Sequence, residues 1–217
     1  MQLSPPHVLP SHGILMKLYC LPGACSLADH IVLEWIGQPY ETHHVARDQL
    51  CSPEYLKINP SGQVPALDED GWVLTENVAI LNYLADRFPA ASLGGDGSAR
   101  SRAETNRWLA MLNSDVHQSF KPLFAPQRFI ADPEQHAELQ ENARNKLRGH
   151  FGRLNAQLTT QDWLTGTRSI ADAYLFVVTR WAYAKQVDLH GLAHLERFVE
   201  RMNNDAGVKA AMQAEGL

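Results

Sequence analysis

The pattern of the sequence changes near residue 99, and this change limits the chain to folds built from two unlike parts. Before it, short apolar runs bounded by turn residues predict strands, and longer periodic runs predict helices. In chain order these are strand 16–21, helix 26–36, strands 39–45, 64–67 and 72–74, and helix 75–88. This order, β-α-β followed by β-β-α, predicts a small mixed sheet with helices packed against it.

The rest of the chain predicts helices only. The periodic runs are 100–120, 133–158, 169–186 and 194–203, followed by a short tail helix. The run 169–186 is apolar on all sides in its interior, which is typical of the buried centre of a helical bundle. It opens with Ser169 and Asp172 in the pattern of a capping box, so we assign Asp172 a structural role.

The charge changes at the same place as the pattern. Residues 1–99 hold 4 Lys and Arg against 11 Asp and Glu, whereas residues 100–217 hold 15 against 13. We therefore predict a first domain at 16–92, a Gly/Ser-rich linker at 93–99 and a helical domain at 100–217. An anionic ligand in the acidic first domain would need local hydrogen-bond donors.

Composition excludes several classes of protein. Residues 1–15 hold three prolines and no Lys or Arg, which predicts a flexible extension, or sequence upstream of a start at Met16, rather than a signal peptide. A net charge of −5 leaves no basic footprint for nucleic acid. No apolar run approaches the ~18–20 residues of a membrane span. Three cysteines, an odd number, argue against a disulfide-stapled secreted domain and favour the cytoplasm.

Cys25 is the first candidate for chemistry. It lies between Pro22-Gly23, which ends a predicted strand, and the first turn of a predicted helix. Free backbone N–H groups and the helix dipole at such a position stabilise a thiolate and lower the pKa of the thiol. The alternative is a small buried hydrophobe at a tight turn. The position alone favours neither interpretation.

Two further segments could contact a ligand through their backbone. A cis Val64–Pro65 bond would turn the Val64 N–H and C=O outward as partners for an extended peptide, whereas a trans bond would make Pro65 an ordinary edge residue. Glu76 and Asn77 open the helix 75–88, where free N–H groups suit a carboxylate. Asn77 can equally be a simple N-cap.

A polar strip follows the helix 100–120. Asn106, Ala110, Asn113 and His117 share one face at helical spacing, and Ser114 neighbours His117. Such a strip either lines a cleft or lies in solvent. Neither CxxC nor HExxH occurs, so no metal site is predicted.

Taken together, these segments resemble a bacterial beta-class glutathione S-transferase along residues 16–217. The matching segments are MKLYCLPGACSLADHIVL (16–33), INPSGQVPAL (58–67), LTENVAILNYLAD (74–86), DVHQSF (115–120), SIADAYLFVVTRWAY (169–183) and AEGL (214–217). Their order and spacing make the match specific. The resemblance implies an α/β thioredoxin-like N-terminal domain, an all-α helical-bundle C-terminal domain and a homodimer.

The resemblance also implies roles for individual residues. The glutathione-binding positions are Cys25, Gln63, Val64, Pro65, Glu76, Asn77, Ser114 and His117. Cys25, which matches a cysteine able to form a mixed disulfide with glutathione, and His117 are the catalytic candidates. The apolar walls for a second substrate are Leu21, Phe120, Phe124 and Trp181.

Three positions depart from the family pattern. Cys20 stands where Tyr is usual, Ala110 where Asn is usual, and Asn77 where Ser or Gly is usual. The loop 46–53 is also short, which leaves Arg47 as the candidate for the cation that meets the glycyl carboxylate of glutathione.

The function implied is transfer of the glutathione thiolate to small apolar electrophiles, with glutathione as co-substrate and no metal. Thiol–disulfide exchange at Cys25 is a second implied activity. The alternative from another class is a non-catalytic ligand-binding or interaction protein of the same fold.

Overall fold

The first part of the chain forms a small four-stranded sheet with helices. The computed structural model describes residues 16–217, so the predicted extension 1–15 lies outside the described residues. The elements are β1 (Met16–Cys20), α1 (Ser26–Ile36), β2 (Tyr40–His44), α2 (Pro53–Leu56), β3 (Ala66–Glu69), β4 (Trp72–Thr75) and α3 (Asn77–Arg87). They confirm the predicted order β-α-β, β-β-α.

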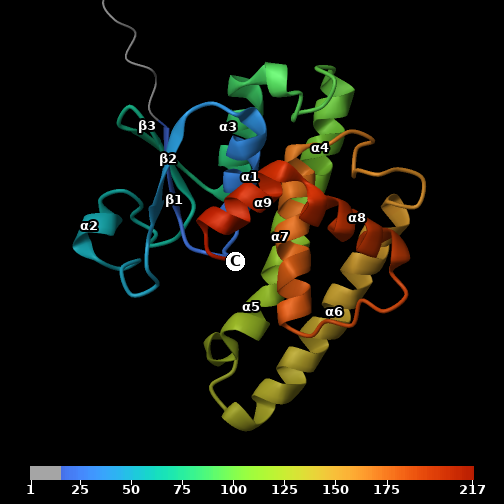
Figure 1. Cartoon of the computed structure of the whole chain (residues 1–217). Coiled ribbons are helices and arrows are strands. Elements are labelled where there is room, and N and C mark those ends of the chain that lie inside the picture. The colour runs from blue at the N-terminus through green and yellow to red at the C-terminus, as the bar shows by residue number, and fades with distance from the viewer. Residues whose placement is uncertain (1–15) are drawn as a thin grey trace, which may run out of the picture.

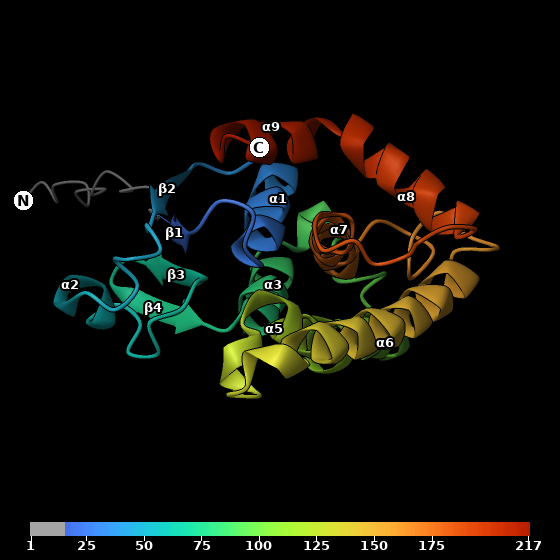
Figure 2. The same cartoon turned by 90° about the horizontal axis from the view of Figure 1, so that it is seen from below.

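The sheet has the strand order β2-β1-β3-β4. β1 and β2 pair in parallel, which requires the crossover through α1, whereas β3 pairs antiparallel with both β1 and β4. The turn between β3 and β4 uses Asp70 and Gly71, both with positive φ, as its sequence predicts. Figures 1 and 2 show α1 and α3 on the side of the sheet that faces the remaining helices, with α2 on the opposite side.

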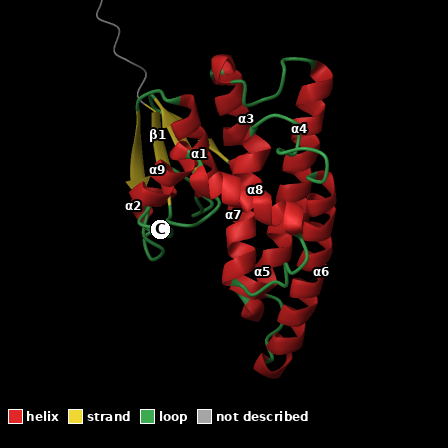
Figure 3. Cartoon of the chain, turned by 45° about the vertical axis from the view of Figure 1, so that its right-hand side comes forward, coloured by secondary structure: helices red, strands yellow, loops and turns green. Residues whose placement is uncertain are grey.

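The second part is helical, and Figure 3 shows its helices beside the sheet. Its α-helices are α4 (Ala99–Met111), α5 (Gln118–Phe124), α6 (His136–Gln157), α7 (Ile170–Ala184), α8 (Ala193–Asn204) and α9 (Ala206–Ala214). No helix in residues 16–217 is both long enough and apolar enough to span a bilayer.

The predicted continuous helix 100–120 is wrong in one respect that matters for the site. Between α4 and α5 the backbone forms a π-helical segment, Leu112–His117, and the helical run continues to Phe124. A π segment holds more residues per turn than an α-helix, so it shifts the face presented by the side chains within and after it. Single-turn π segments are frequent at functional sites.

α7 is the buried centre of the molecule, as predicted. Every residue from Ile170 to Thr179 is buried, and the helix contacts α1, α3, α4 and α8. The capping box at its start is present: the Asp172 carboxylate accepts from Ser169 N at 2.9 Å and from Leu164 N at 2.9 Å. The structural role predicted for Asp172 is therefore confirmed.

The two parts share one hydrophobic core, and α9 returns from the end of the chain to pack on α1. Figure 2 shows α9 lying directly against α1. The predicted linker 93–99 stays a prediction. Within it, Leu93 is buried and its carbonyl accepts from Ile170 N at 3.0 Å. The packing of α9 on α1 matters because α1 carries the first candidate residue, Cys25, at its N-terminus.

Candidate active site

A cavity of about 300 Å³ lies where the first domain meets the π-helical segment. Seven of the predicted site residues line it: Cys25, Gln63, Val64, Pro65, Glu76, Asn77 and His117. Residues that no sequence argument placed there complete the lining: Leu50, Asn59, Ser61, Gly62, Gln118 and Lys121, with Asn113 from the polar strip. The cavity therefore joins four segments that lie far apart in the sequence.

Cys25 is the N-cap residue of α1, and its thiol faces the cavity. The Sγ atom donates to the carbonyl of Val64 at 3.6 Å. The N–H groups of Cys25 and Ser26 lower its pKa, but burial, aided by the charge of Asp29, prevails and raises the pKa of the thiol to about 12. The predicted thiolate is therefore wrong for the free protein, because desolvation outweighs the helix terminus.

The segment 63–65 forms one wall of the cavity. The Val64–Pro65 peptide bond is cis, as one of the two interpretations predicts, and β3 starts at Ala66 rather than at Val64. The carbonyl of Gln63 accepts from Tyr55 Oη at 2.6 Å and from Asn59 Nδ2 at 2.7 Å. These two hydrogen bonds hold the backbone of the segment in place beside Cys25.

Glu76 and Asn77, at the start of α3, also line the cavity. Glu76 is exposed and has φ 74°, a conformation that favours glycine and costs other residues of order 1–3 kcal/mol. No side chain caps α3 within the described chain, so the N-cap role considered for Asn77 is wrong. With its amide nitrogen turned inward, Asn77 donates to Asp29 Oδ2 at 2.9 Å and to the Cys25 carbonyl at 3.1 Å.

Asp29 lies beneath this site and is fully buried. Burial raises the pKa of its carboxyl well above the usual range. Asp29 thus contributes a buried hydrogen-bonding group that connects α1 to the start of α3 through Asn77.

His117 reaches the cavity from the π-helical segment. Its Nδ1 lies 2.6 Å from Tyr174 Oη, and its ring contacts Trp181 edge-on at 4.8 Å between centroids. Burial, with the positive charge of Lys121, lowers the pKa of the imidazole to about 4. The ring is therefore neutral at physiological pH, and Tyr174 fixes its orientation.

Several predicted site residues lie elsewhere. Ser114 is exposed, lies outside the lining, and donates to the carbonyl of Ala110 at 2.8 Å, whereas its neighbours on the strip, Asn113 and His117, line the cavity. Arg47 is exposed and also lies outside the lining, whereas Lys121 supplies a cation at the cavity. Lys121 follows His117 by four residues in the helical run, a spacing that could have indicated it.

The four predicted apolar walls do not line the cavity. Phe120 is fully buried in the core, and Leu21 is half-buried. Phe124 stacks on Phe120 and remains 45% exposed. Trp181 packs on His117 and donates from Nε1 to the carbonyl of Gly23 at 2.8 Å. Trp181 therefore helps to hold the turn that precedes Cys25.

The fold also gathers three buried groups of metal-ligand type that no sequence spacing indicates. The candidate ligand atoms of Cys20, His30 and Glu215 lie within 4.8 Å of one another. Both carboxylate oxygens of Glu215 already take part in hydrogen bonds, one with His30 Nδ1 and one with Gly23 N. Hydrogen bonding therefore accounts for His30 and Glu215, and Cys20 is part of the hydrophobic core.

Comparison with known proteins gives one consistent result. The family model of the glutathione S-transferase N-terminal domain matches residues 30–92, and that of the C-terminal domain matches residues 103–206. A glutathione S-transferase of Xanthomonas campestris, GST-4.5, is 53% identical over 203 residues, which cover 93% of this chain and 100% of that protein.

Solved structures agree with the sequence relatives. A glutathione S-transferase from Xylella fastidiosa superposes with a TM-score of 0.91 at 52% identity, covering 93% of this chain and 99% of the other. A bacterial beta-class enzyme from Sphingomonas chungbukensis superposes with a TM-score of 0.83 at 36% identity, covering 93% and 99%. With both domain models matched in order over a shared fold, the chain belongs to the glutathione S-transferase family.

Proposed function

We propose that this chain binds glutathione in the cavity beside Cys25 and transfers its sulfur to apolar electrophiles. The observation that carries the proposal is the convergence of Cys25, the segment 63–65 and Glu76 on one cavity. A solved glutathione transferase homologue from Sulfitobacter, with bound glutathione, supports it: the two chains superpose with a TM-score of 0.87 at 27% identity, covering 94% of this chain and 100% of the other.

The lining matches the groups of a γ-glutamyl tripeptide. Glu76 offers a carboxylate for the amino group, and the uncapped N-terminus of α3 offers N–H groups for the adjacent carboxylate. The Val64 backbone runs beside Cys25 and suits the central residue of an extended peptide. Lys121 provides positive charge for the remaining carboxylate.

The chemistry proposed follows from Cys25 being a neutral thiol. A neutral S–H can donate a hydrogen bond to the sulfur of bound glutathione and so favour its thiolate, whose proton leaves to water. The thiolate then attacks an electrophilic carbon, a C–S bond forms, and a leaving group such as chloride departs with the bonding electrons. His117, held neutral, orients groups in the cavity and does not serve as a cationic acid.

The oligomer and compartment are part of the proposal. We propose a homodimer, supported by the resemblance to the family and by Trp72, which is 50% exposed on the edge strand β4. Cys20, Cys25 and Cys51 are all free, which suits a cytoplasmic setting.

The experiment compares wild type with Cys25→Ala, using Cys51→Ala as the matched control because Cys51 is exposed and lies outside the cavity. Each protein is passed over immobilised glutathione and then assayed with an aryl chloride and with hydroxyethyl disulfide. The proposal expects retention of all three proteins and a transferase rate that falls only in Cys25→Ala. Retention without any turnover would instead favour the non-catalytic binding protein, and no retention would exclude glutathione as the ligand.

A further inference from the structure

The turn before Cys25 is held by side chains from the far end of the chain. Gly23, two residues before Cys25, has φ 74°, and both of its polar backbone atoms are bonded to the helical domain. Its N–H donates to Glu215 Oε2 at 2.9 Å, and its carbonyl accepts from Trp181 Nε1 at 2.8 Å. The local sequence of the turn therefore does not fix its position alone.

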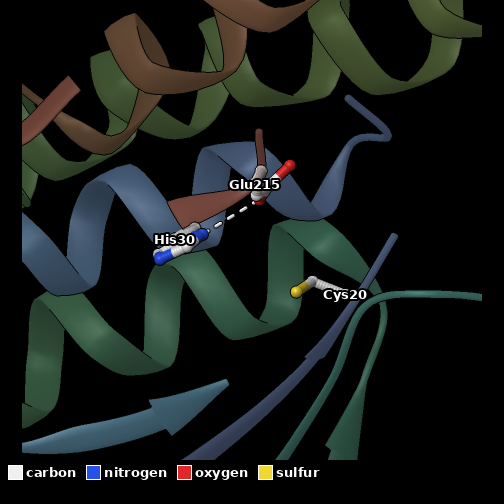
Figure 4. Close-up of side chains that lie close together, drawn as sticks. All are labelled: Cys20, His30 and Glu215. Atoms are coloured by element: carbon white, nitrogen blue, oxygen red, sulfur yellow. Dashed lines mark hydrogen bonds and ion pairs between the residues drawn. The ribbon is translucent and has the colours of Figure 1, made fainter. Parts of the chain in front are cut away.

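Glu215 bridges this turn to α1. Its other oxygen, Oε1, lies 2.9 Å from Nδ1 of His30, and the side chains of both residues are almost completely buried. Figure 4 shows the carboxylate reaching His30 on α1, with Cys20 nearby on β1. One carboxylate thus connects the turn that precedes Cys25 with the helix that Cys25 begins.

The C-terminus is built to present this carboxylate. The N–H of Glu215 donates to the Ala211 carbonyl at 3.1 Å, and that of Leu217 donates to the Met212 carbonyl at 2.9 Å. A side-chain carbon of Leu217 lies 3.7 Å from where a Gly23 Cβ would be. The segment AEGL (214–217), which does not line the cavity, thereby packs against the turn.

A buried carboxylate is a costly way to pack the end of a helix. Desolvation of such a group is expensive, and apolar residues of similar volume often stabilise a fold equally well or better. What the carboxylate provides that an apolar side chain could not is a bond to a specific backbone N–H. The geometry therefore points to a role in placing the turn, beyond its share in stability.

We propose that Glu215 is a positioning residue for Cys25: its bonds to Gly23 and His30 hold the turn so that the Cys25 thiol meets the sulfur of bound glutathione. This inference rests on the proposed function for its kinetic part only. Removing the bond frees the turn, and misplacement of a catalytic group by about 1 Å can cost up to about 10²-fold in rate.

The test measures Cys25 in two ways on the full-length protein. Alkylation by iodoacetamide, with the modified cysteine identified by peptide mapping, reports how closed the turn is without any glutathione. Steady-state kinetics with glutathione and an aryl chloride report its alignment. In Glu215→Ala we expect alkylation of Cys25 to be several-fold faster, because the turn opens. We expect kcat/KM to fall by up to about tenfold.

Four further variants separate positioning from stability. Glu215→Gln keeps an oxygen for Gly23 and should stay close to wild type in both measurements. Val208→Ala weakens the packing of α9, and Gln213→Ala changes an exposed residue of the same helix; both should leave Cys25 alkylation and kcat/KM unchanged. If Glu215→Ala does not fold, Trp181→Phe removes the other bond to Gly23 and should also accelerate alkylation.

Wild-type alkylation and kinetics in a folded Glu215→Ala would overturn the inference. It would also be overturned if Val208→Ala changed both measurements as much as Glu215→Ala, since stability would then explain the effect. A wild-type protein without glutathione activity would refute the proposed function, while the alkylation measurement would still decide whether Glu215 holds the turn.

Discussion

Cys25 shows how opposing influences on one thiol are resolved by their relative strength. The N–H groups of Cys25 and Ser26 favour the thiolate, whereas burial and the charges of Asp29 and Glu76 oppose it. Position in the sequence indicated the first influence, but burial depends on the tertiary fold and could not be predicted from the turn alone. The structure places Cys25 in the lining of the cavity, and the lowered pKa predicted for it is wrong.

This ionisation predicts how Cys25 reacts with oxidised glutathione. The thiolate attacks the disulfide, a Cys25–glutathione bond forms, and one glutathione thiolate leaves. Because the pKa of Cys25 is raised to about 12, the reactive thiolate fraction should rise about tenfold per pH unit throughout pH 7–9. Mass spectrometry of the Cys25 peptide over this range measures the rate, and Cys25→Ala serves as the blank. A rate that levels off near pH 7 would show that the thiolate forms readily.

His117 predicts both a kinetic and a stability effect. The sequence places His117 on a polar face, which predicts that removing it leaves the melting temperature nearly unchanged. In the structure, however, His117 packs against Trp181 and Tyr174. His117→Ala should therefore lower turnover about 10- to 100-fold and cost about 1 kcal/mol of stability through the lost Tyr174 bond. Kinetics and thermal unfolding measure the two, with exposed Asn106→Ala as control. An unchanged rate would assign His117 to packing alone.

The pKa of His117 adds a pH signature. Since its pKa is lowered to about 4, the imidazole is neutral across pH 6–8. The pH–rate profiles of wild type and His117→Ala should therefore have the same shape in this interval. An inflection in wild type that is absent from His117→Ala would mean that the ring titrates in the working enzyme.

Among the elements, those with a strong period and clear boundary residues were predictable. α1 ends at Gly37 with φ 70°, and the hairpin turns at Asp70-Gly71, both as their sequences indicate. The π-helical segment at Leu112–His117 was not predictable, since a helical period of 3.6 assigns the same residues to a regular helix. Asn113 and His117, both in this segment, line the cavity, whereas Ser114 does not.

The capping box of α7 gives a stability prediction for an element. The Asp172 carboxylate accepts from Ser169 N, Ser169 Oγ and Leu164 N, all buried. Asp172→Ala leaves these donors without an acceptor and should cost about 2–4 kcal/mol of unfolding free energy. Glu138→Ala, an exposed acidic residue in the first turn of α6, should cost less than about 0.5 kcal/mol. Denaturant unfolding compares them, and equal costs would show that the box contributes little.

At the scale of the whole molecule, the site is completed by contacts that span almost the entire chain. Gly23 is bonded to residues 158 and 192 positions away, and Asn77 connects α3 with Asp29 on α1. Family resemblance named seven of the fourteen residues that line the cavity. It could not identify Glu215 or Tyr174, because an acidic residue near a chain end and a Tyr within an apolar helix both have ordinary structural explanations.

The assembly proposed for the molecule is a homodimer. Sedimentation at micromolar concentration should give twice the chain mass of 24.2 kDa. Trp72→Glu, which adds charge to the exposed edge of the sheet, should shift this value toward the monomer if β4 lies at the interface. A wild-type mass of one chain at this concentration would contradict the dimer.

Calorimetric titration measures whether glutathione binds in the cavity at Glu76. Wild type should bind one glutathione per chain. Glu76→Gly removes the carboxylate while relieving the strained φ of 74°, so it should raise thermal stability slightly and weaken binding about 10- to 100-fold. Ser92 is exposed, lies outside the cavity and has φ 54°. Ser92→Gly therefore controls for the relief of backbone strain and should bind glutathione like wild type. Absence of binding to wild type, or equal affinity in Glu76→Gly, would show that glutathione does not bind at Glu76.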